Sequence, residues 1–220
     1  NTLGATTTGA SNTAVGNAAM NTNTTGAQNT AIGAVSLAAN TTADNNTAVG
    51  YSALAVNTTG HSNVAVGNYA LDAITTGIKC VAVGYDALGT NTDNSNTAIG
   101  YAALALNTTG STTVAVGAYA LDANTTGDNN VAVGNDSLSS NTTASNNVAV
   151  GTSALAVNTA DDNTAVGTSA LDANTTGNGL VAVGKNALGA NTTASENTAV
   201  GGNAMIANTT GTANVAVGYN

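Results

Sequence analysis

Small apolar residues recur along the chain with a fixed period. The Gly of A-[VI]-G occurs thirteen times between Gly16 and Gly218, and ten of the twelve intervals are 17 residues while two are 16. Numbered from the Asn of N-T-A-V-G, the repeat unit reads N-[TV]-A-[VI]-G-x-x-[AS]-L-x-x-N-T-T-[GA]-x-x. A short period that persists from end to end indicates a solenoid or a repeat array.

The positions of the repeat differ in how much they vary. Position 3 is Ala in all thirteen copies, position 4 is Val or Ile, position 9 is Leu or Met, and position 13 is Thr. Position 12 is Asn except at Thr6 and Ile74, whereas positions 6, 7, 10, 16 and 17 vary freely. Residues held constant within one chain serve the same purpose in every copy.

The repeat predicts an all-β fold. A unit of 17 residues is too short for the helical repeats, which have about 33 to 47 residues, and Val, Ile and Thr favour strands. We expect a strand at positions 2–4, a corner at Gly of position 5, a second strand at positions 8–11 and a tight turn at N-T-T-G. Each unit then forms one coil of a parallel β-solenoid (β-roll), with positions 4 and 9 inside.

Stacking of about thirteen such coils, about 4.8 Å apart, predicts a rod of roughly 60 Å. Asn at position 12 and Thr at position 13 would form side-chain ladders along it. The sequence L-D-A recurs at Leu71, Leu121 and Leu171, which indicates duplication of a three-coil unit. No linker interrupts the pattern, so residues 1–220 are expected to form a single repetitive domain.

The pattern also predicts self-association. Because positions 2, 3 and 4 are all largely apolar, neither side of the strand is polar, and the invariant Ala of position 3 would let another chain approach closely. Asn1 and Asn220 occupy the same position of the repeat. We therefore expect either a longer repetitive chain or subunits stacked end to end, with the coil at Tyr219 continuing into one that resembles the coil at Leu3.

Composition excludes several classes of function. Charged residues make up 6% of the chain, aromatic residues 3%, and the net charge is −9 with no Arg. Nucleic acids and anionic membranes are recognised through basic patches, so neither is an expected partner. No apolar run approaches the roughly 20 residues of a membrane-spanning helix, so membrane insertion is not expected.

Residues that could perform catalysis are few. His61, the single histidine, lies at a variable position, and Asp72, Asp122 and Asp172 are three coils apart, about 14 Å by the stacking distance. We therefore expect no enzyme, no metal site and no cofactor. Cys80, which replaces Asn at position 1, is expected to be a buried thiol.

Two sets of residues are candidates for contacts with other molecules. Tyr51, Tyr69, Tyr85, Tyr101 and Tyr119 fall at position 6 or 7 of five consecutive coils, where they either pack along an exposed corner or form a strip for a glycan or another partner. Nine N-T-T sequences, among them those at Asn57, Asn107 and Asn124, have the form of N-glycosylation acceptors. If position 12 faces inward, no glycan can attach.

The N-N-V-A-V-G sequences at residues 129–134 and 146–151 resemble the N-S-V-A-I-G coil motif in the heads of trimeric autotransporter adhesins. The sequence N-T-A-V-G-Y-S-A-L-A-V-N-T-T-G is similar to repeats of bacteriophage tail-fibre and related fibre proteins. The resemblance covers essentially the whole chain and implies a left-handed parallel β-roll, commonly trimeric, in an exposed attachment fibre. The adhesin coil is shorter and lacks N-T-T-G, so its trimer geometry is not carried over.

These observations predict a structural extracellular fibre or filament segment, or the shaft of an adhesin or tail fibre, on a cell surface or virion. An ice-binding solenoid that uses the Thr and Asn ladders is the alternative. In a Thr-x-Thr strand, both Thr side chains lie on the same face and can meet an ice surface together. The adjacent threonines of the N-T-T-G turn lack this arrangement, so they favour ice binding less.

Overall fold

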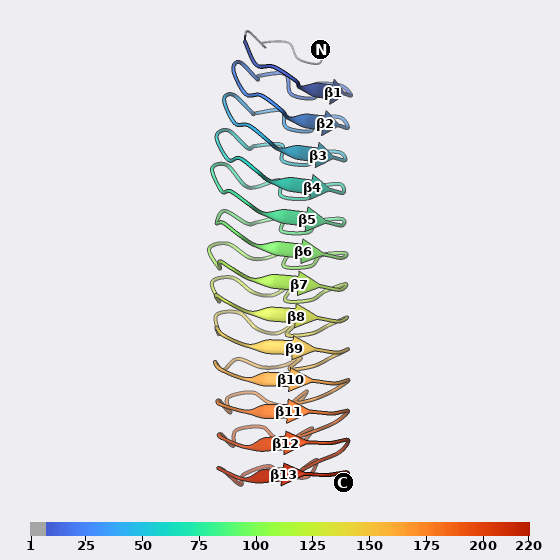
Figure 1. Cartoon of the computed structure of the whole chain (residues 1–220), viewed down its shortest axis with the longest axis vertical. Helices are drawn as coiled ribbons and strands as arrows, with labels where there is room; N and C mark the ends of the chain where they lie inside the picture. The colour runs from blue at the N-terminus through green and yellow to red at the C-terminus, as the bar shows by residue number, and fades with distance from the viewer. Residues whose placement is uncertain (1–7) are drawn as a thin grey trace.

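The computed structural model describes residues 8–220, so Leu3, Thr6 and Thr7 of the first repeat lie outside the described part. Thirteen three-residue strands stack in chain order into a single parallel sheet that runs the length of a straight rod (Figure 1). The expected all-β parallel solenoid with coils of about 17 residues is thus confirmed. The strands are β1 (Thr13–Val15), β2 (Thr30–Ile32), β3 (Thr47–Val49), β4 (Val64–Val66), β5 (Val81–Val83), β6 (Thr97–Ile99), β7 (Val114–Val116), β8 (Val131–Val133), β9 (Val148–Val150), β10 (Thr164–Val166), β11 (Val181–Val183), β12 (Thr198–Val200) and β13 (Val215–Val217).

Equivalent repeat positions are paired in every neighbouring pair of strands. Ala115 of β7, for example, lies opposite Ala132 of β8. The two 16-residue intervals keep this register, since Ala82 still pairs with Ala98 and Ala149 with Ala165. The missing residue is absorbed in the N-T-T-G turn, whose place is taken by N-T-D in one of these coils and N-T-A in the other.

The predicted second strand is wrong. Positions 8–11 form turns, and the backbone at positions 7 and 9 is left-handed, as at Ala102 (φ 51°) and Leu104 (φ 54°). A left-handed non-glycine residue costs roughly 1–2 kcal/mol. Hydrogen bonds between coils offset that cost, because the Ala102 amide donates to Tyr85 O (2.9 Å) and the Leu104 amide to Ala120 O (3.0 Å).

The core lies between the sheet and these turns. Ala of position 3 and Leu of position 9 face inward, as Ala98 and Leu104 show with no exposed surface, and position 8 is also buried. Position 9 is therefore confirmed as inside, but the expectation for position 4 is wrong: Ile99 is 41% exposed. Adjacent strand residues face opposite ways, and Leu fills the narrow interior so that only Ala fits opposite it.

The invariant Ala of position 3 is consequently not a surface for another chain, as the sequence had suggested. Its side chain is buried in the interior of its own coil. The outward apolar residues are those of positions 2 and 4 instead.

The predicted corner at position 5 requires glycine for two reasons. In all thirteen copies the φ angle lies between 131° and 145°, a region that other residues rarely adopt. The copies also stack backbone against backbone: a Cβ on Gly117 would lie 2.5 Å from the carbonyl oxygen of Gly134 in the next coil.

A ladder of buried Asn side chains, the position-12 ladder, runs along the interior of the N-T-T-G turns. Asn124 donates from Nδ2 to Asn107 Oδ1 (2.8 Å) in the preceding coil and to Gly127 O (3.1 Å) in its own turn. Its Oδ1 accepts from Asn141 Nδ2 (2.9 Å) in the following coil. The Asn side chain thus closes its own turn and joins three coils.

Asn of position 1 forms a second buried ladder with a different pattern. Asn46 donates from Nδ2 to Gly60 O (2.8 Å), and its Oδ1 accepts from the backbone amide of Asn63 (3.0 Å) in the next coil. The Thr hydroxyls of position 13 form the third ladder, in which Thr108 Oγ1 donates to Thr125 O (2.9 Å). The predicted Asn and Thr ladders are therefore present in the described coils.

The position-12 ladder is interrupted where the repeat departs from its consensus. Ile74 replaces Asn and offers no donor, and Asn57 Oδ1 in the preceding coil is buried without a hydrogen-bond partner. In the shortened turn, Asn158 donates to Ala160 O (2.7 Å), and Asn141 Oδ1 is likewise left without a partner. The hydrogen bond between two position-12 residues is therefore lost only where the next residue has no amide side chain or is displaced by a shortened turn.

We expect Leu104→Asp to abolish cooperative folding, because it places an unpaired charge in the interior. Leu104→Ala should cost about 2–5 kcal/mol of unfolding free energy. Leu106, two residues further along and 54% exposed, is the matched control, and Leu106→Asp should change the free energy by less than about 0.5 kcal/mol. Urea unfolding followed by circular dichroism measures all three, and equal losses at both sites would contradict the assigned core.

Asn124→Ala should lower the unfolding free energy by about 2–4 kcal/mol, because it removes three hydrogen bonds and leaves the buried Asn107 Oδ1 and Gly127 O without the Asn124 donor. Asn135→Ala is the control, since Asn135 makes a single exposed side-chain bond to Ala118 O (3.1 Å). Thermal unfolding of the two variants compares them directly. A loss at Asn124 no larger than that at Asn135 would show that the ladder does not stabilise the rod.

Candidate interaction surface

The outer face of the sheet, defined as positions 2 and 4 of the thirteen strands, contains only Thr, Val and Ile. Residues in the middle of the rod remain well exposed, for example Ile99 at 41% and Val166 at 37%. No charged residue lies on this face. The acidic residues all occupy other positions of the coil: Asp44, Asp72, Asp86, Asp93, Asp122, Asp128, Asp136, Asp161, Asp162, Asp172 and Glu196.

The five candidate tyrosines form a continuous ladder of rings along the corner that follows β3 to β7. Neighbouring ring centroids lie 5.3–5.8 Å apart; the Tyr85 and Tyr101 rings are nearly parallel (10°), and the other three contacts are edge-to-face. The rings nevertheless stay 36–50% exposed. Both expectations for the strip are compatible with this geometry, since the rings pack on one another and also face solvent.

The tyrosine ladder is not needed for the corner to form. Position 6 is Thr152 in the coil of β9 and Thr168 in that of β10, and these coils keep the same turn and the same pairing. The aromatic rings are therefore a local addition to five coils, beside the outer face of the sheet. A purely structural requirement would recur in every coil.

The Asn residues of the N-T-T sequences face inward. Asn57, Asn107 and Asn124 have no exposed surface, and each donates from Nδ2 to the Asn Oδ1 of the preceding coil and to a carbonyl of its own turn. Because position 12 faces inward at these three residues, a glycan cannot attach to them in the folded chain.

Acidic residues from successive coils meet at one corner. Burial raises the pKa of Asp122, and the neighbouring Asp136 carboxylate raises it further, against the opposing effect of a backbone hydrogen bond. Asp122 Oδ1 is buried without a hydrogen-bond partner. Asp72 has a raised pKa mainly because of burial and also because of Asp86, so the arrangement recurs three coils earlier. Sequence spacing alone did not reveal these pairs, because their members are 14 residues apart and lie at different repeat positions.

Groups with potential reactivity are dispersed. His61 is exposed, and its Nδ1 lies 3.2 Å from Ser62 Oγ. Burial raises the pKa of the Cys80 thiol, whose Sγ donates to Asp93 O (3.2 Å), so the thiolate is disfavoured. Within residues 8–220, no group of three or more His, Cys, Asp or Glu side chains could hold a metal ion. The same residues include no helix that is long and apolar enough to cross a membrane.

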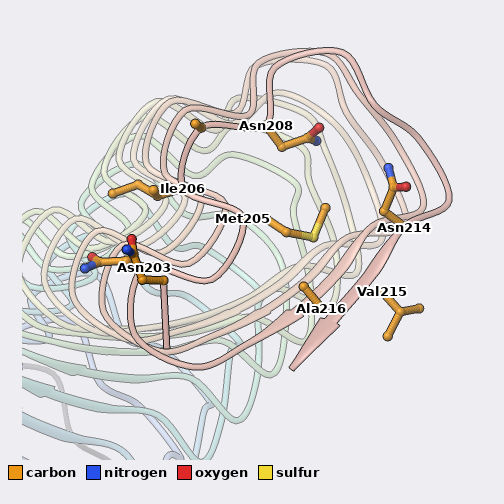
Figure 2. A pocket seen from close by; sticks show the side chains of 9 residues that line it. Asn203, Met205, Ile206, Asn208, Asn214, Val215 and Ala216 are labelled. Carbon is orange, nitrogen blue, oxygen red and sulfur yellow. The ribbon is translucent and has the colours of Figure 1, made fainter. Parts of the chain in front are cut away.

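A hollow of about 540 Å³ lies at the last coil, beside β13 (Figure 2). Met205 projects into it from the turn, with Ala216 of β13 facing it and Asn208 and Asn214 at its rim, whereas the Val215 side chain points away from it. In the earlier coils, the coil that follows covers the equivalent backbone and the Leu or Met of position 9. The hollow is therefore the uncovered interior of one coil, in which Met205 and Ala216 occupy the core positions 9 and 3.

Comparison of the chain with protein-family models, with curated proteins and with solved structures gives no match. The resemblance to adhesin heads and tail fibres is carried by the coil motif. The solenoid fold is established independently, by the strand pairing of the chain itself.

We expect Asp122→Asn to stabilise the rod at neutral pH. A carboxyl group whose folded pKa exceeds its unfolded pKa binds more protons in the folded state, so stability is lost as pH rises from the unfolded value, about 3.9, through the raised folded value. The amide avoids this loss, and its advantage should disappear below that window. Asp172→Asn is the matched control, because Asn186 takes the place of Asp136 there. Thermal melting from pH 3 to 8 tests the difference; a pH-independent gain from Asp122→Asn would contradict it.

Proposed function

We propose that the chain is a structural segment of an extracellular fibre or filament, or of the shaft of an adhesin or tail fibre. The observation that supports this most strongly is the uninterrupted bonding between coils. In the coil of β6, backbone amides at positions 2, 5, 7, 9, 11 and 13 all donate to the coil above or below, and Asn and Thr side chains add further bonds.

This arrangement suits a shaft. Because each coil contacts its neighbours alone, the length of the rod increases in proportion to the number of coils, with no change in the core. A pull along the axis acts on every bond between two coils together. The side-chain chemistry is correspondingly uniform, and the variable positions all lie at the corners, where residues change without disturbing the ladders.

An exposed fibre also fits the surface of the rod. The charge of −9 resides at the corners and on the faces away from the sheet, which favours solubility and gives no basis for binding nucleic acid or anionic lipid. An attachment role would place a receptor or a glycan at a local feature such as the tyrosine ladder.

Ice binding is the second candidate, and one observation favours it: the outer face is regular, uncharged and built from Thr, Val and Ile in register. The structural basis differs from the one the sequence suggested. Hydroxyls of the position-13 ladder are bonded to carbonyl groups, and the position-12 amides are buried, so neither faces an external surface freely. Positions 2 and 4 do alternate along a strand, as a lattice-binding face requires.

The fibre proposal is tested by locating the native chain. Antibodies raised against the recombinant rod, used for immunogold electron microscopy of the cells or virions that produce it, should label thin projections along their length. Label confined to the interior of cells would contradict the proposal. Thermal hysteresis of the purified rod, with no labelled fibre, would favour ice binding instead.

A further inference from the structure

We propose that two copies of this chain associate side by side through the outer face of the sheet, with the tyrosine ladder along its border. This pairing rests on the fibre proposal for its biological meaning, and it identifies the partner of one shaft as a second, identical shaft. The charge, the area and the shape of the face all favour this pairing.

Charge is distributed very unevenly around the coil. The chain has 11 acidic residues and two lysines, yet the outer face has none of them on any of thirteen strands. Depletion of charged residues distinguishes the centre of a protein interface from the rest of the surface. The acidic corners would remain in water when two outer faces meet, because both chains have their carboxylates at the other positions of the coil.

The area is sufficient for a stable pair. Thirteen strands at about 4.8 Å and three residues at about 3.3 Å give a strip of about 60 by 10 Å, or about 600 Å² before side-chain relief is added. The tyrosine ladder follows the same strands in five coils, at the corner after Gly of position 5. Two such strips bury about 1,200 Å² in total, which is the lower end of the range for specific protein interfaces, and one strip equals the upper end of the roughly 300–600 Å² of the largest apolar patch on a typical monomer.

The shape favours two copies. The strand arrows in Figure 1 lie one above another in a straight column, so a second identical column can lie against it along its whole length. Each chain has one such face, and a surface that pairs with its own copy closes after two subunits; a ring of three needs two different patches on each chain.

The tyrosines add anchoring contacts at the border of this surface. Tyr85 and Tyr101 are 47% and 50% exposed although their rings stack. Burying such rings against a partner releases a large apolar area while the hydroxyl groups can stay in water, which is why Tyr is enriched among residues that dominate interfaces. Thr fills the same position in other coils, so the rings can be removed without altering the fold.

Sedimentation equilibrium of the full chain over a range of concentrations tests the proposal. A monomer–dimer equilibrium is expected. The double variant Val133→Glu with Val166→Glu should raise the dimer dissociation constant by at least about tenfold, because each copy then places two unpaired charges in the buried interface. Both side chains point outward, at 36% and 37% exposed, so folding should be preserved. Thr126→Glu, which adds a charge at an exposed corner, is the control and should leave the constant unchanged.

A second variant keeps the test decisive if the glutamates prevent folding. Tyr85→Thr with Tyr101→Thr uses the residue found at this position in the coils of β9 and β10, and it should weaken the dimer with an unchanged circular dichroism spectrum.

Four results would overturn the pairing. The chain could stay monomeric at all concentrations, form a trimer, form open-ended polymers that the Val133→Glu/Val166→Glu substitutions do not affect, or form a dimer whose dissociation constant those substitutions do not change. A monomer whose thermal hysteresis is lost in the glutamate variant would assign the face to ice. In each case, immunogold labelling of fibres would leave the fibre proposal standing, so the two proposals fail separately.

Discussion

The structure depends on the hydrogen bonds that each coil makes with the next, above all those of the buried asparagines. A coil of about 17 residues encloses too little apolar volume to be stable alone: its interior contains two small side chains and one Leu. It also buries backbone carbonyl groups in the turn, which must be paired. An Asn side chain has donors and an acceptor, so it can satisfy the turn of its own coil and the Asn of an adjacent coil at once.

This constraint explains which residues are invariant. Position 3 must be Ala because Leu of position 9 fills the space opposite, and position 5 must be Gly because successive corners stack backbone on backbone. The same constraint explains the tolerated departures. Cys80 can replace an Asn of position 1 because its backbone amide still donates to Asn63 Oδ1 (2.9 Å), as the amide of an Asn at this position would. Ile74 breaks the ladder locally, and the cost is one unpaired oxygen, that of Asn57.

Much of the fold could be predicted from the sequence, because the period, the Gly corner, the Leu of position 9 and the two ladders are direct consequences of residue identity. Two features could not. Because side chains alternate along a strand, positions 3 and 4 must face opposite sides of the sheet, but both residues are apolar and either could be the buried one. The small volume of the interior decides that Ala, and not Val or Ile, faces inward. The left-handed backbone at Leu104 and its equivalents could not be predicted from residue type, because Leu seldom adopts this conformation. Of the candidate surface, the tyrosine strip was visible as a pattern; the outer face was missed because position 4 had been placed inside.

Hydrogen exchange of the Asn side-chain amides, measured by NMR on the unmodified chain, tests whether the buried Asn amides link the coils. The Nδ2 protons of positions 1 and 12 should exchange far more slowly than those of exposed residues such as Asn135. Protection should be weaker at Asn91 and Asn158, whose Nδ2 groups make no bond to an Asn Oδ1 of the preceding coil. Exchange of all Asn side-chain amides at the rate of exposed ones, while the backbone stays protected, would contradict the claim.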